Sequence, residues 1–262
     1  MAHKIVCSIQ KGGVGKSTTT VILAELLAAA GFKVLVLDLD SQGNATAMIT
    51  GNDIYEYSGK TILEAMKEMN PRDYIVHAKE NIDLLPAEDM LVTFSRYIYT
   101  QGVQGKIHVL KRTIEEIEDQ YDYILMDSAP ALGDLTLNAI VYADYIIIPV
   151  QLGGFCLTAL DRFVDFVEGA RQDGHTDAKI LGIIFTMKDR SRTEREIGSN
   201  IRERYKSMVF STEIKKRAKL KEFSLTGVSM SRKDEADALQ DYIDLTEEIV
   251  TRINEGAKQD GQ

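Results

Sequence analysis

The sequence predicts an α/β fold in which a doubly wound, mostly parallel β-sheet is flanked by helices. Short apolar, β-branched runs alternate along the chain with longer helical patterns, which is typical of strands joined by right-handed crossovers. The strand runs are continuously hydrophobic, as expected for a parallel sheet covered on both faces. The 262 residues contain no internal repeat or Pro/Ser-rich linker. We therefore expect one domain over residues 1–255 and a flexible tail over residues 256–262.

The expected elements follow one another in a regular order. Buried strands are predicted at residues 4–9, 33–40, 82–86, 121–127, 144–150 and 178–186. Helices are predicted between them at residues 17–30, 61–69, 104–119 and 157–173.

A last helix is predicted at about residues 235–254. We expect its apolar stripe to pack on the sheet; the stripe consists of Leu239, Tyr242, Ile243, Thr246, Ile249, Val250 and Ile253. Its polar face is acidic, carrying Glu235, Asp237, Asp241, Asp244, Glu247 and Glu248. Anionic lipid would repel such a face.

The composition is that of an ordinary globular protein, with 44% hydrophobic and 27% charged residues. No run of about 18 apolar residues is present, so we expect no membrane span. The first ten residues lack a signal-peptide layout, which favours a cytoplasmic location. Cys7 and Cys156 lie far apart and are expected to be reduced core thiols.

Charge is distributed unevenly along the chain. The net charge is −9, yet residues 188–221 carry 12 lysines and arginines against five acids, a local charge of +7 that leaves −16 elsewhere. A basic zone on an acidic body indicates a localised anion-binding face.

The stretch QKGGVGKSTTT, residues 10–20, joins the first strand to the first helix. It nearly fits the phosphate-binding loop G-x-x-x-x-G-K-[ST], with Gln10 in place of the first glycine. Glycines let backbone N–H groups turn toward phosphate oxygens, and the helix amino terminus adds a positive dipole. We expect Lys16 to reach the β- and γ-phosphates and Ser17 to hold Mg²⁺. The predicted nucleotide-binding residues are Gly12, Gly13, Val14, Gly15, Lys16, Ser17 and Thr18.

Lys11, at the amino-terminal end of the loop, is awkwardly placed to help its own nucleotide. It could instead reach the nucleotide of a second subunit, as an arginine finger does in trans. The alternative is a solvated surface lysine.

Three acids are expected at the same edge of the sheet. Asp38 and Asp40 lie at the carboxyl end of one strand and Asp127 ends another. One of the first two could bind Mg²⁺ through water while the other orients the attacking water. Asp127 is interpreted as the Walker B carboxylate. Each acid alone would more often cap a turn or a helix, but their convergence on a phosphate loop favours catalysis.

These motifs resemble those of the ParA/MinD family of P-loop ATPases, which carry a deviant Walker A loop. The resemblance lies in KGGVGKST (11–18), VLVLDLDSQGNAT (34–46), YDYILMDSAPALGDLTLNAI (121–140) and DYIIIPVQ (144–151). It extends over about residues 4–253 and is closest to the short ParA/Soj partition ATPases. It implies ATP and Mg²⁺ as cofactors. It also implies that Asp40 positions water while Asp38 lies on the metal side, with Lys11 and Lys16 completing the catalytic set.

The resemblance further implies a function in plasmid or chromosome segregation. Such ATPases close an ATP-bound sandwich dimer, bind nucleoid DNA without sequence preference and hydrolyse ATP slowly until a ParB-like centromere-binding partner stimulates them. Lys and Arg on phosphates release counterions and read no bases. The expected DNA contacts are Arg190, Lys215, Lys216, Arg217 and Lys219. For residues 187–206, a solvated and salt-bridged helix face explains the charges equally well.

The sequence departs from the family pattern at three places. Ser41 replaces a usual proline, and the segment QLGGF (151–155) has glycines where close relatives carry acidic or aromatic residues. Lys215 replaces a proline that often helps to form the adenine pocket. ATP rather than GTP is therefore implied by the family alone.

Three alternative functions are compatible with parts of this pattern. A MinD-like positioning ATPase would need a lipid-binding tail. A reductase similar to the nitrogenase iron protein would need two cluster cysteines per subunit, and Cys7 lies inside a strand instead. A non-enzymatic, ATP-gated DNA-coating scaffold would bind DNA with only incidental hydrolysis.

Overall fold

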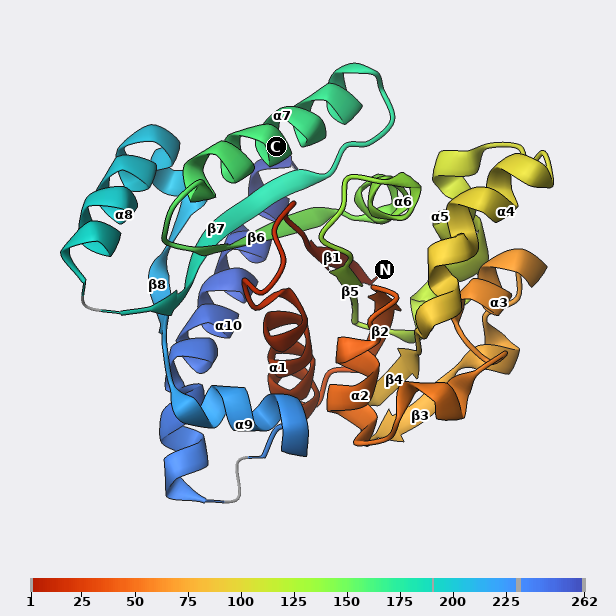
Figure 1. The fold of residues 1–262 in the computed structure, drawn as a ribbon, viewed down its shortest axis with the longest axis horizontal. Helices are drawn as coiled ribbons and strands as arrows, with labels where there is room; N and C mark the ends of the chain where they lie inside the picture. The colour runs from red at the N-terminus through yellow and green to blue at the C-terminus, as the bar shows by residue number, and fades with distance from the viewer. Residues whose placement is uncertain (1, 190, 230–231, 261–262) are drawn as a thin grey trace.

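The computed structural model describes residues 2–189, 191–229 and 232–260. Within these residues an eight-stranded sheet has the order β3-β4-β2-β5-β1-β6-β7-β8, with β3 antiparallel to β4 and the other neighbours parallel (Figure 1). This confirms the doubly wound, mostly parallel sheet. The strands are β1 (His3–Cys7), β2 (Val34–Leu39), β3 (Val76–Lys79), β4 (Ile82–Leu85), β5 (Tyr123–Ser128), β6 (Tyr145–Gln151), β7 (Lys179–Lys188) and β8 (Val209–Lys215).

Two of these strands, β3 and β8, were not expected from hydrophobicity. Both lie at the ends of the strand order, and every residue of β3 is at least partly exposed. In β8 polar residues occupy the middle of the strand. An edge strand is only partly covered, so it lacks the continuous apolar run by which the central strands were recognised.

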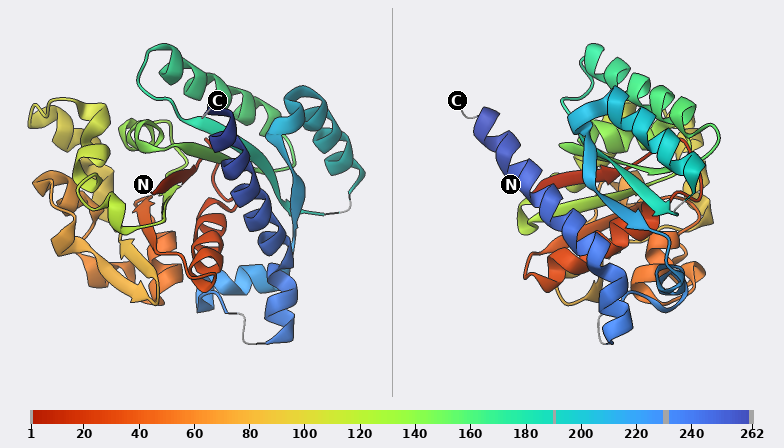
Figure 2. Two further views of the ribbon diagram at one scale, coloured as in Figure 1. Left: turned by 180° about the vertical axis from the view of Figure 1, so that it is seen from behind. Right: turned by 90° about the vertical axis from the view of Figure 1, so that its left-hand side faces the viewer.

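Helices cover both faces of the sheet (Figure 2). On one face lie α3 (Ile62–Glu68), α4 (Phe94–Thr100), α5 (Val109–Ile114), α6 (Asp134–Tyr142), α7 (Cys156–Gln172) and α8 (Arg192–Tyr205). On the other lie α1 (Lys16–Ala29), α2 (Asn44–Thr50), α9 (Ala218–Thr226) and α10 (Lys233–Asp260).

The helix expected over residues 104–119 is only partly formed. Only α5 is α-helical there, and 3₁₀ turns occupy Lys106–His108 and Glu118–Gln120. The Ile117 N–H bonds the carbonyl of Ile114 at 2.9 Å, three residues back rather than four. The apolar side of the segment stays buried, so the amphipathic pattern was real although the hydrogen bonding tightens.

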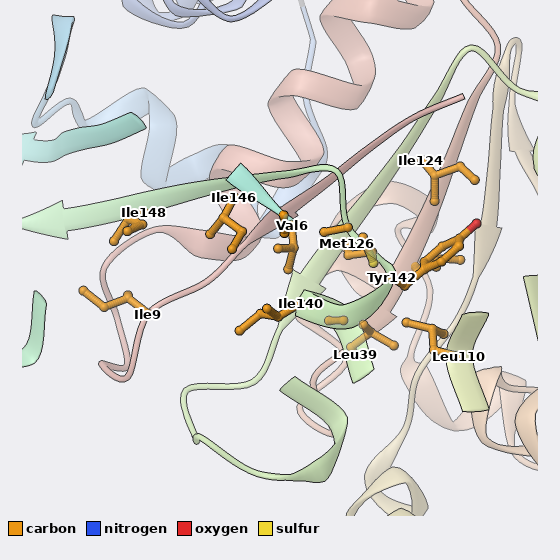
Figure 3. Close-up of a cluster of buried hydrophobic side chains, with 14 of the residues drawn as sticks. Val6, Ile9, Leu39, Leu110, Ile124, Met126, Ile140, Tyr142, Ile146 and Ile148 are labelled. Carbon is orange, nitrogen blue, oxygen red and sulfur yellow. The ribbon is translucent and has the colours of Figure 1, made fainter. Parts of the chain in front are cut away.

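Side chains along the central strands alternate between the two apolar clusters, as the strand period of two requires. In β5, Ile124 and Met126 belong to the cluster beneath α6, whereas Tyr123 and Leu125 belong to the cluster beneath α1. Figure 3 shows the first of these clusters, with Met126 near Val6. By the same alternation, Asp127 and its register partner Asp38 face α1. The sheet thus directs two carboxylates toward the helix that follows the glycine-rich loop.

The predicted stripe of α10 is confirmed in part, since Leu239, Tyr242, Ile249 and Ile253 are buried in the cluster beneath the helix. Leu245 is buried there too although it was not predicted, whereas Ile243, Thr246 and Val250 are only partly buried. The helix continues to Asp260, into the segment expected to be flexible, so that flexibility stays a prediction. The acidic face does not point wholly to solvent, because it packs partly against β8 and the chain before α10. Among the described residues, no helix has the length and apolar character needed to cross a bilayer.

Glu248 fastens α10 to the edge strand β8. Its carboxylate accepts the backbone N–H and the hydroxyl of both Ser211 and Thr212, all at 2.9 to 3.0 Å. Arg252 donates to the same carboxylate at 2.9 Å. Burial alone would raise the pKa of Glu248, but the donors from Ser211 and Thr212 outweigh it and lower the pKa to about 2.

We predict that Glu248→Gln lowers the free energy of unfolding by about 2 kcal/mol near neutral pH. Because the pKa is depressed from 4.5 to about 2, the carboxylate's contribution is complete above pH 4.5 and is lost as the pH falls toward 2. Urea unfolding should show the difference between variant and unaltered chain shrinking over that interval. Glu247→Gln, at an exposed position beside it, is the control. Equal effects of the two substitutions would contradict the assignment.

Candidate nucleotide-binding site

The loop between β1 and α1 has the backbone conformation that phosphate binding needs. Gly13 and Gly15 have φ angles of 71° and 86°, in the left-handed region where a side chain is strained. Helix α1 begins at Lys16, directly after Gly15. Its first N–H groups have no acceptor within the helix, so they are available to anionic oxygens.

Contacts from neighbouring strands hold this loop in place. Val14 is buried, and its carbonyl accepts the Thr186 hydroxyl from β7 at 2.8 Å. Beneath the loop, the Ser128 hydroxyl contacts the Ser8 hydroxyl at 2.8 Å. The contact of Thr186 with the loop was not predicted from the sequence; its only signal is a hydroxyl residue that follows the apolar run of β7.

The two lysines of the loop have different surroundings. Lys16 is buried, and its Nζ donates to the carbonyl oxygen of Lys11 at 3.0 Å. Burial lowers the pKa of Lys16, and the charges of Asp127 and Asp40 oppose that effect. The Lys11 side chain is only partly buried, and its ammonium has no hydrogen bond or ion pair within the described residues. Lys11 therefore carries a charge that no acid of the described chain neutralises.

Asp127 is a buried carboxylate whose oxygens both lack a hydrogen-bond partner among the described residues. Burial raises its pKa well above the usual range and the Asp38 charge adds to this, while the nearby Ser17 hydroxyl and the Lys16 ammonium act in the opposite direction. An unpaired buried carboxylate is costly, and a cation beside it removes that cost. Mg²⁺ commonly takes one or two carboxylates and completes its shell with phosphate and water. Asp127 and Ser17 therefore fit a Mg²⁺ ion bound together with a nucleotide.

Asp38, the register partner of Asp127, is surrounded differently. Its Oδ2 accepts the N–H and the hydroxyl of Thr46 at 2.8 and 2.7 Å, and its Oδ1 accepts the Asp40 N–H at 3.2 Å. Burial raises the pKa of Asp38 to about 6, and the Thr46 donors oppose the rise. These contacts show Asp38 orienting the segment that carries Asp40, and its role on the metal side stays a prediction.

Asp40 and the loop together border a hollow of about 370 Å³. The Asp40 carboxylate, nearly buried, accepts the Gln42 N–H at 3.1 Å. The other residues that line the hollow include Gly12, Gly13, Gly15, Lys16, Ser17, Thr18, Asn44, Ala47, Met48, Pro130, Met187 and Ser224. The water-positioning acid and the phosphate loop predicted from the sequence thus lie on the same hollow.

A second, mostly apolar pocket of about 470 Å³ adjoins this hollow. The two share Gly15, Thr18, Met187 and Ser224, so one molecule could extend from one into the other. The walls come from the end of β7, from residues 214–221 and from Tyr242 of α10, whose hydroxyl contacts the Thr19 hydroxyl of α1 at 3.2 Å. Its character suits a nucleotide base. Sequence analysis left the base pocket unassigned because its walls are far apart in the chain.

The residues predicted to contact DNA lie near the end of β8 and the start of α9, except Arg190, which is outside the described residues. Lys215 and Arg217 approach Asp241 at 2.9 and 3.6 Å. Lys219 approaches Glu222 and Asp234, whereas Lys216 is exposed. In α8, three arginines form ion pairs: Arg192 with Glu196, Arg202 with Glu213 and Arg204 with Asp161. Those pairs favour the salt-bridged interpretation for α8.

Comparisons with known proteins agree with this geometry. A family model described as an AAA domain matches residues 2–180. The chromosome-partitioning ATPase Soj of Treponema pallidum is 33% identical over 258 residues, covering 96% of this chain and 98% of that protein. A variant of McdA from Cyanothece, solved with ATP, has a TM-score of 0.85 at 25% identity, covering 97% and 96% of the two chains. A plasmid partition protein of Borrelia burgdorferi, solved with AMPPNP, has a TM-score of 0.79 at 26% identity, covering 98% and 100%.

The two neighbouring carboxylates should respond oppositely to amide substitution. We predict that Asp127→Asn leaves the unfolding free energy of the nucleotide-free chain unchanged or higher, because it removes a buried carboxylate that has no hydrogen-bond partner among the described residues and puts an uncharged amide in its place. Asp38→Asn should lower it by about 1–3 kcal/mol, because the amide has a single oxygen and cannot accept both the Thr46 donors and the Asp40 N–H. Urea unfolding measures both. Thermal shifts should also show that Asp127→Asn abolishes the stabilisation by ATP that depends on Mg²⁺. Equal destabilisation by the two variants would refute this account.

Proposed function

Because this chain belongs to the ParA/Soj-type partition ATPases, we propose that it segregates a plasmid or a chromosome by an ATP-driven cycle of dimerisation and DNA binding. The chain is an ATPase of the P-loop class. The observation that carries the proposal is the unpaired Asp127 carboxylate beside Ser17 and the phosphate loop. That arrangement favours a charged, metal-bound triphosphate over a neutral ligand.

Each residue of the site has a separate role in hydrolysis. Lys16 exchanges the Lys11 carbonyl for phosphate oxygens, and the N–H groups of the loop bind the same anion. Ser17 and Asp127 hold Mg²⁺, which neutralises charge on the phosphates when it is bound. Asp40 borders the phosphate hollow, where its carboxylate orients the attacking water. Asp38 keeps Asp40 in place through the backbone.

A second copy of the chain closes over the nucleotide. Lys11 supplies the positive charge that crosses to the partner's phosphates, since no acid of the described chain neutralises it. Large apolar side chains are exposed in the segments that follow β4, β6 and β8: Val92 is 74% exposed, Phe155 88% and Leu225 of α9, next to Ser224 of the hollow, 84%. Burial of these side chains between two copies would favour the closed dimer.

The dimer binds double-stranded DNA through the basic segment around Lys215 and Lys216, and so resides on the nucleoid. Contacts of this kind neutralise phosphates and carry no sequence preference. A ParB-like partner bound at a centromere stimulates hydrolysis, which returns monomers and releases the DNA.

We predict that ATP with Mg²⁺ raises the affinity for random-sequence duplex DNA at least tenfold over ADP or no nucleotide, and that added salt weakens the complex steeply. Fluorescence anisotropy with a labelled duplex, at two salt concentrations and in three nucleotide states, measures this. Equal affinity for DNA in all three nucleotide states would show that nucleotide does not control DNA binding, and would contradict the proposed cycle.

Lys11→Ala should abolish ATP-dependent dimerisation and lower hydrolysis at least tenfold, since the partner's phosphates lose a neutralising charge. Nucleotide binding by the single subunit should persist, because Lys16 is untouched. Light scattering, a phosphate-release assay and ATP titration separate the three effects. Lys60→Ala, at an exposed position outside the site, is the matched control. A fully active dimer of Lys11→Ala would overturn the role in trans.

A further inference from the structure

A basic groove of about 860 Å³ lies where β7 and β8 end. It is lined by Lys188, Asp189, Arg195, Glu213, Lys215, Lys216 and Arg217. The cations of this groove are not equivalent. Lys216 and Arg195 are exposed and have no ion pair within the described part of the chain. The other three are each held by a carboxylate.

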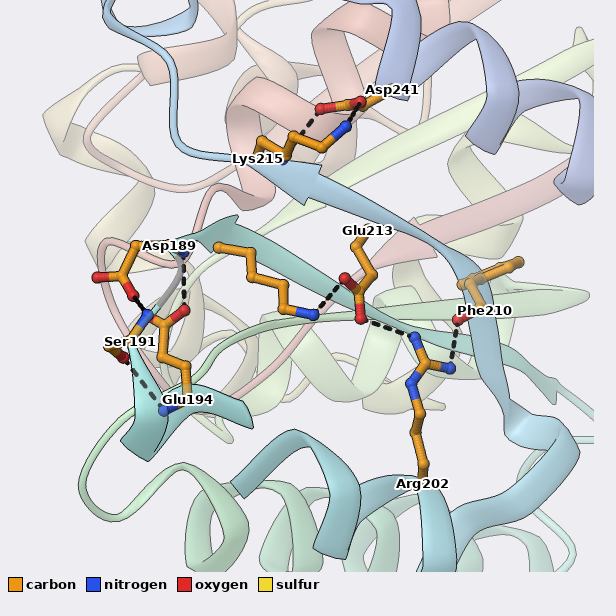
Figure 4. A network of polar contacts seen from close by, with 9 residues as sticks. Asp189, Ser191, Glu194, Arg202, Phe210, Glu213, Lys215 and Asp241 are labelled. Atoms are coloured by element: carbon orange, nitrogen blue, oxygen red, sulfur yellow. Dashed lines mark hydrogen bonds and ion pairs between the residues drawn. The ribbon is translucent and has the colours of Figure 1, made fainter. Parts of the chain in front are cut away.

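Asp241 of α10 holds two of these cations at once. Its side chain is only 7% exposed. Its Oδ1 accepts the Lys215 Nζ at 2.9 Å, and its Oδ2 accepts the Lys215 N–H at 3.1 Å (Figure 4). The Arg217 Nε lies 3.6 Å from Oδ2. Burial alone would raise the pKa of Asp241, but the Lys215 hydrogen bonds and the charges of Lys215 and Arg217 outweigh it. The pKa therefore lies below its usual value, and the carboxylate is ionised near neutral pH.

The opposite wall of the groove has a different arrangement. Glu213 accepts from Lys188 and, at 3.0 Å, from Arg202 (Figure 4). Arg202 also donates to the Phe210 carbonyl at 3.0 Å and lies over the Phe185 ring. Because Arg202 is bound to the fold in three ways, the Glu213 pair joins α8 to the sheet. Lys215, by contrast, has a side chain that is 66% exposed, so its ammonium can leave Asp241 for another anion.

We propose that Asp241 is a built-in counterion that competes with DNA phosphates for Lys215 and Arg217, and thereby lowers the affinity of the nucleotide-free chain for DNA. This inference rests on the proposed function, because it takes the groove to be the DNA-binding face. While Asp241 is paired, the three groups carry one net positive charge instead of two. DNA binding by the nucleotide-free chain then depends on Lys216, on Arg195 and on that single remaining charge.

The nucleotide pocket gives a physical route for relieving this competition. Lys215, Lys216 and Arg217 line both the groove and the apolar base pocket, so they form a wall between the two. Tyr242, next to Asp241 in sequence, lines the base pocket as well. A base seated in the pocket contacts that wall from the side opposite the groove. Nucleotide binding therefore acts on the segment that Asp241 holds, and it shifts Lys215 and Arg217 toward DNA.

Asp241→Asn tests the proposal, because the amide oxygen still accepts the Lys215 N–H while the charge is removed. We expect the nucleotide-free variant to bind random-sequence duplex DNA about five- to tenfold more tightly at low salt. Its slope of log affinity against log salt should become steeper by about 0.9, the value for one more neutralised phosphate. With ATP bound, the substitution should raise the affinity for DNA by less. In the variant, the ratio of the affinity with ATP to the affinity without nucleotide should therefore be smaller than in the unaltered chain.

Glu247→Gln is the matched control, since it changes the net charge equally on the same helix at an exposed position outside the groove. The proposal fails if Asp241→Asn leaves the nucleotide-free affinity unchanged, or if Glu247→Gln raises it as much. A double-mutant cycle sharpens the test: Lys215→Gln should weaken DNA binding more in the Asp241→Asn background than in the unaltered chain.

If Asp241→Asn does not fold, the salt dependence of DNA binding by the unaltered chain still tests the proposal. With Lys216, Arg195 and the one net positive charge left on the Asp241 group, its nucleotide-free salt slope is expected at about −2.7, whereas a slope of about −3.6 would show that Lys215 and Arg217 both already contact phosphates and would overturn the proposal. Failure of the proposed function is recognised separately: the unaltered chain would then show no gain in DNA affinity with ATP, whatever Asp241→Asn does.

Discussion

Two carboxylates occupy neighbouring register positions in the interior of the sheet, where water does not reach them, and the site is organised around their charge. Asp38 is satisfied by donors from Thr46 and Asp40, whereas neither oxygen of Asp127 accepts a hydrogen bond from the described part of the chain. Because β2 and β5 are paired in parallel and in register, both side chains must face α1. The fold therefore fixes where a cation is needed before any ligand arrives, and the phosphate loop lies directly above that place.

A second constraint links the nucleotide to the basic groove. The segment from Lys215 to Arg217 is too short to fold on its own, and its conformation depends on β8, on Asp241 and on the pocket behind it. Cations that seem available in the sequence are therefore partly neutralised in the fold. This favours a basic surface whose strength depends on what occupies the base pocket, rather than one of constant charge.

Local patterns were sufficient to predict the central strands, the phosphate loop and most of the buried side of α10, because each depends on neighbouring residues. The edge strands β3 and β8 could not be recognised in this way, since partial exposure removes their apolar signal. The base pocket and the Asp241 pairs join residues from β7, β8 and α10, and no spacing in the chain encodes such contacts. Likewise, the contrast between Asp38 and Asp127 depends on Thr46, which lies in a helix that was not predicted. The roles of the individual site residues remain predictions.

At the end of β7, three consecutive side chains have three different roles. Thr186 holds the phosphate loop, Met187, whose φ of 51° is left-handed, lines both the phosphate hollow and the base pocket, and Lys188 lines the basic groove. Because the three roles fall on consecutive residues, deleting one residue here would displace the side chains of the others from their present surroundings. Evolution can alter the identity of each side chain at this strand end, but it cannot change the spacing of one without disturbing the other two.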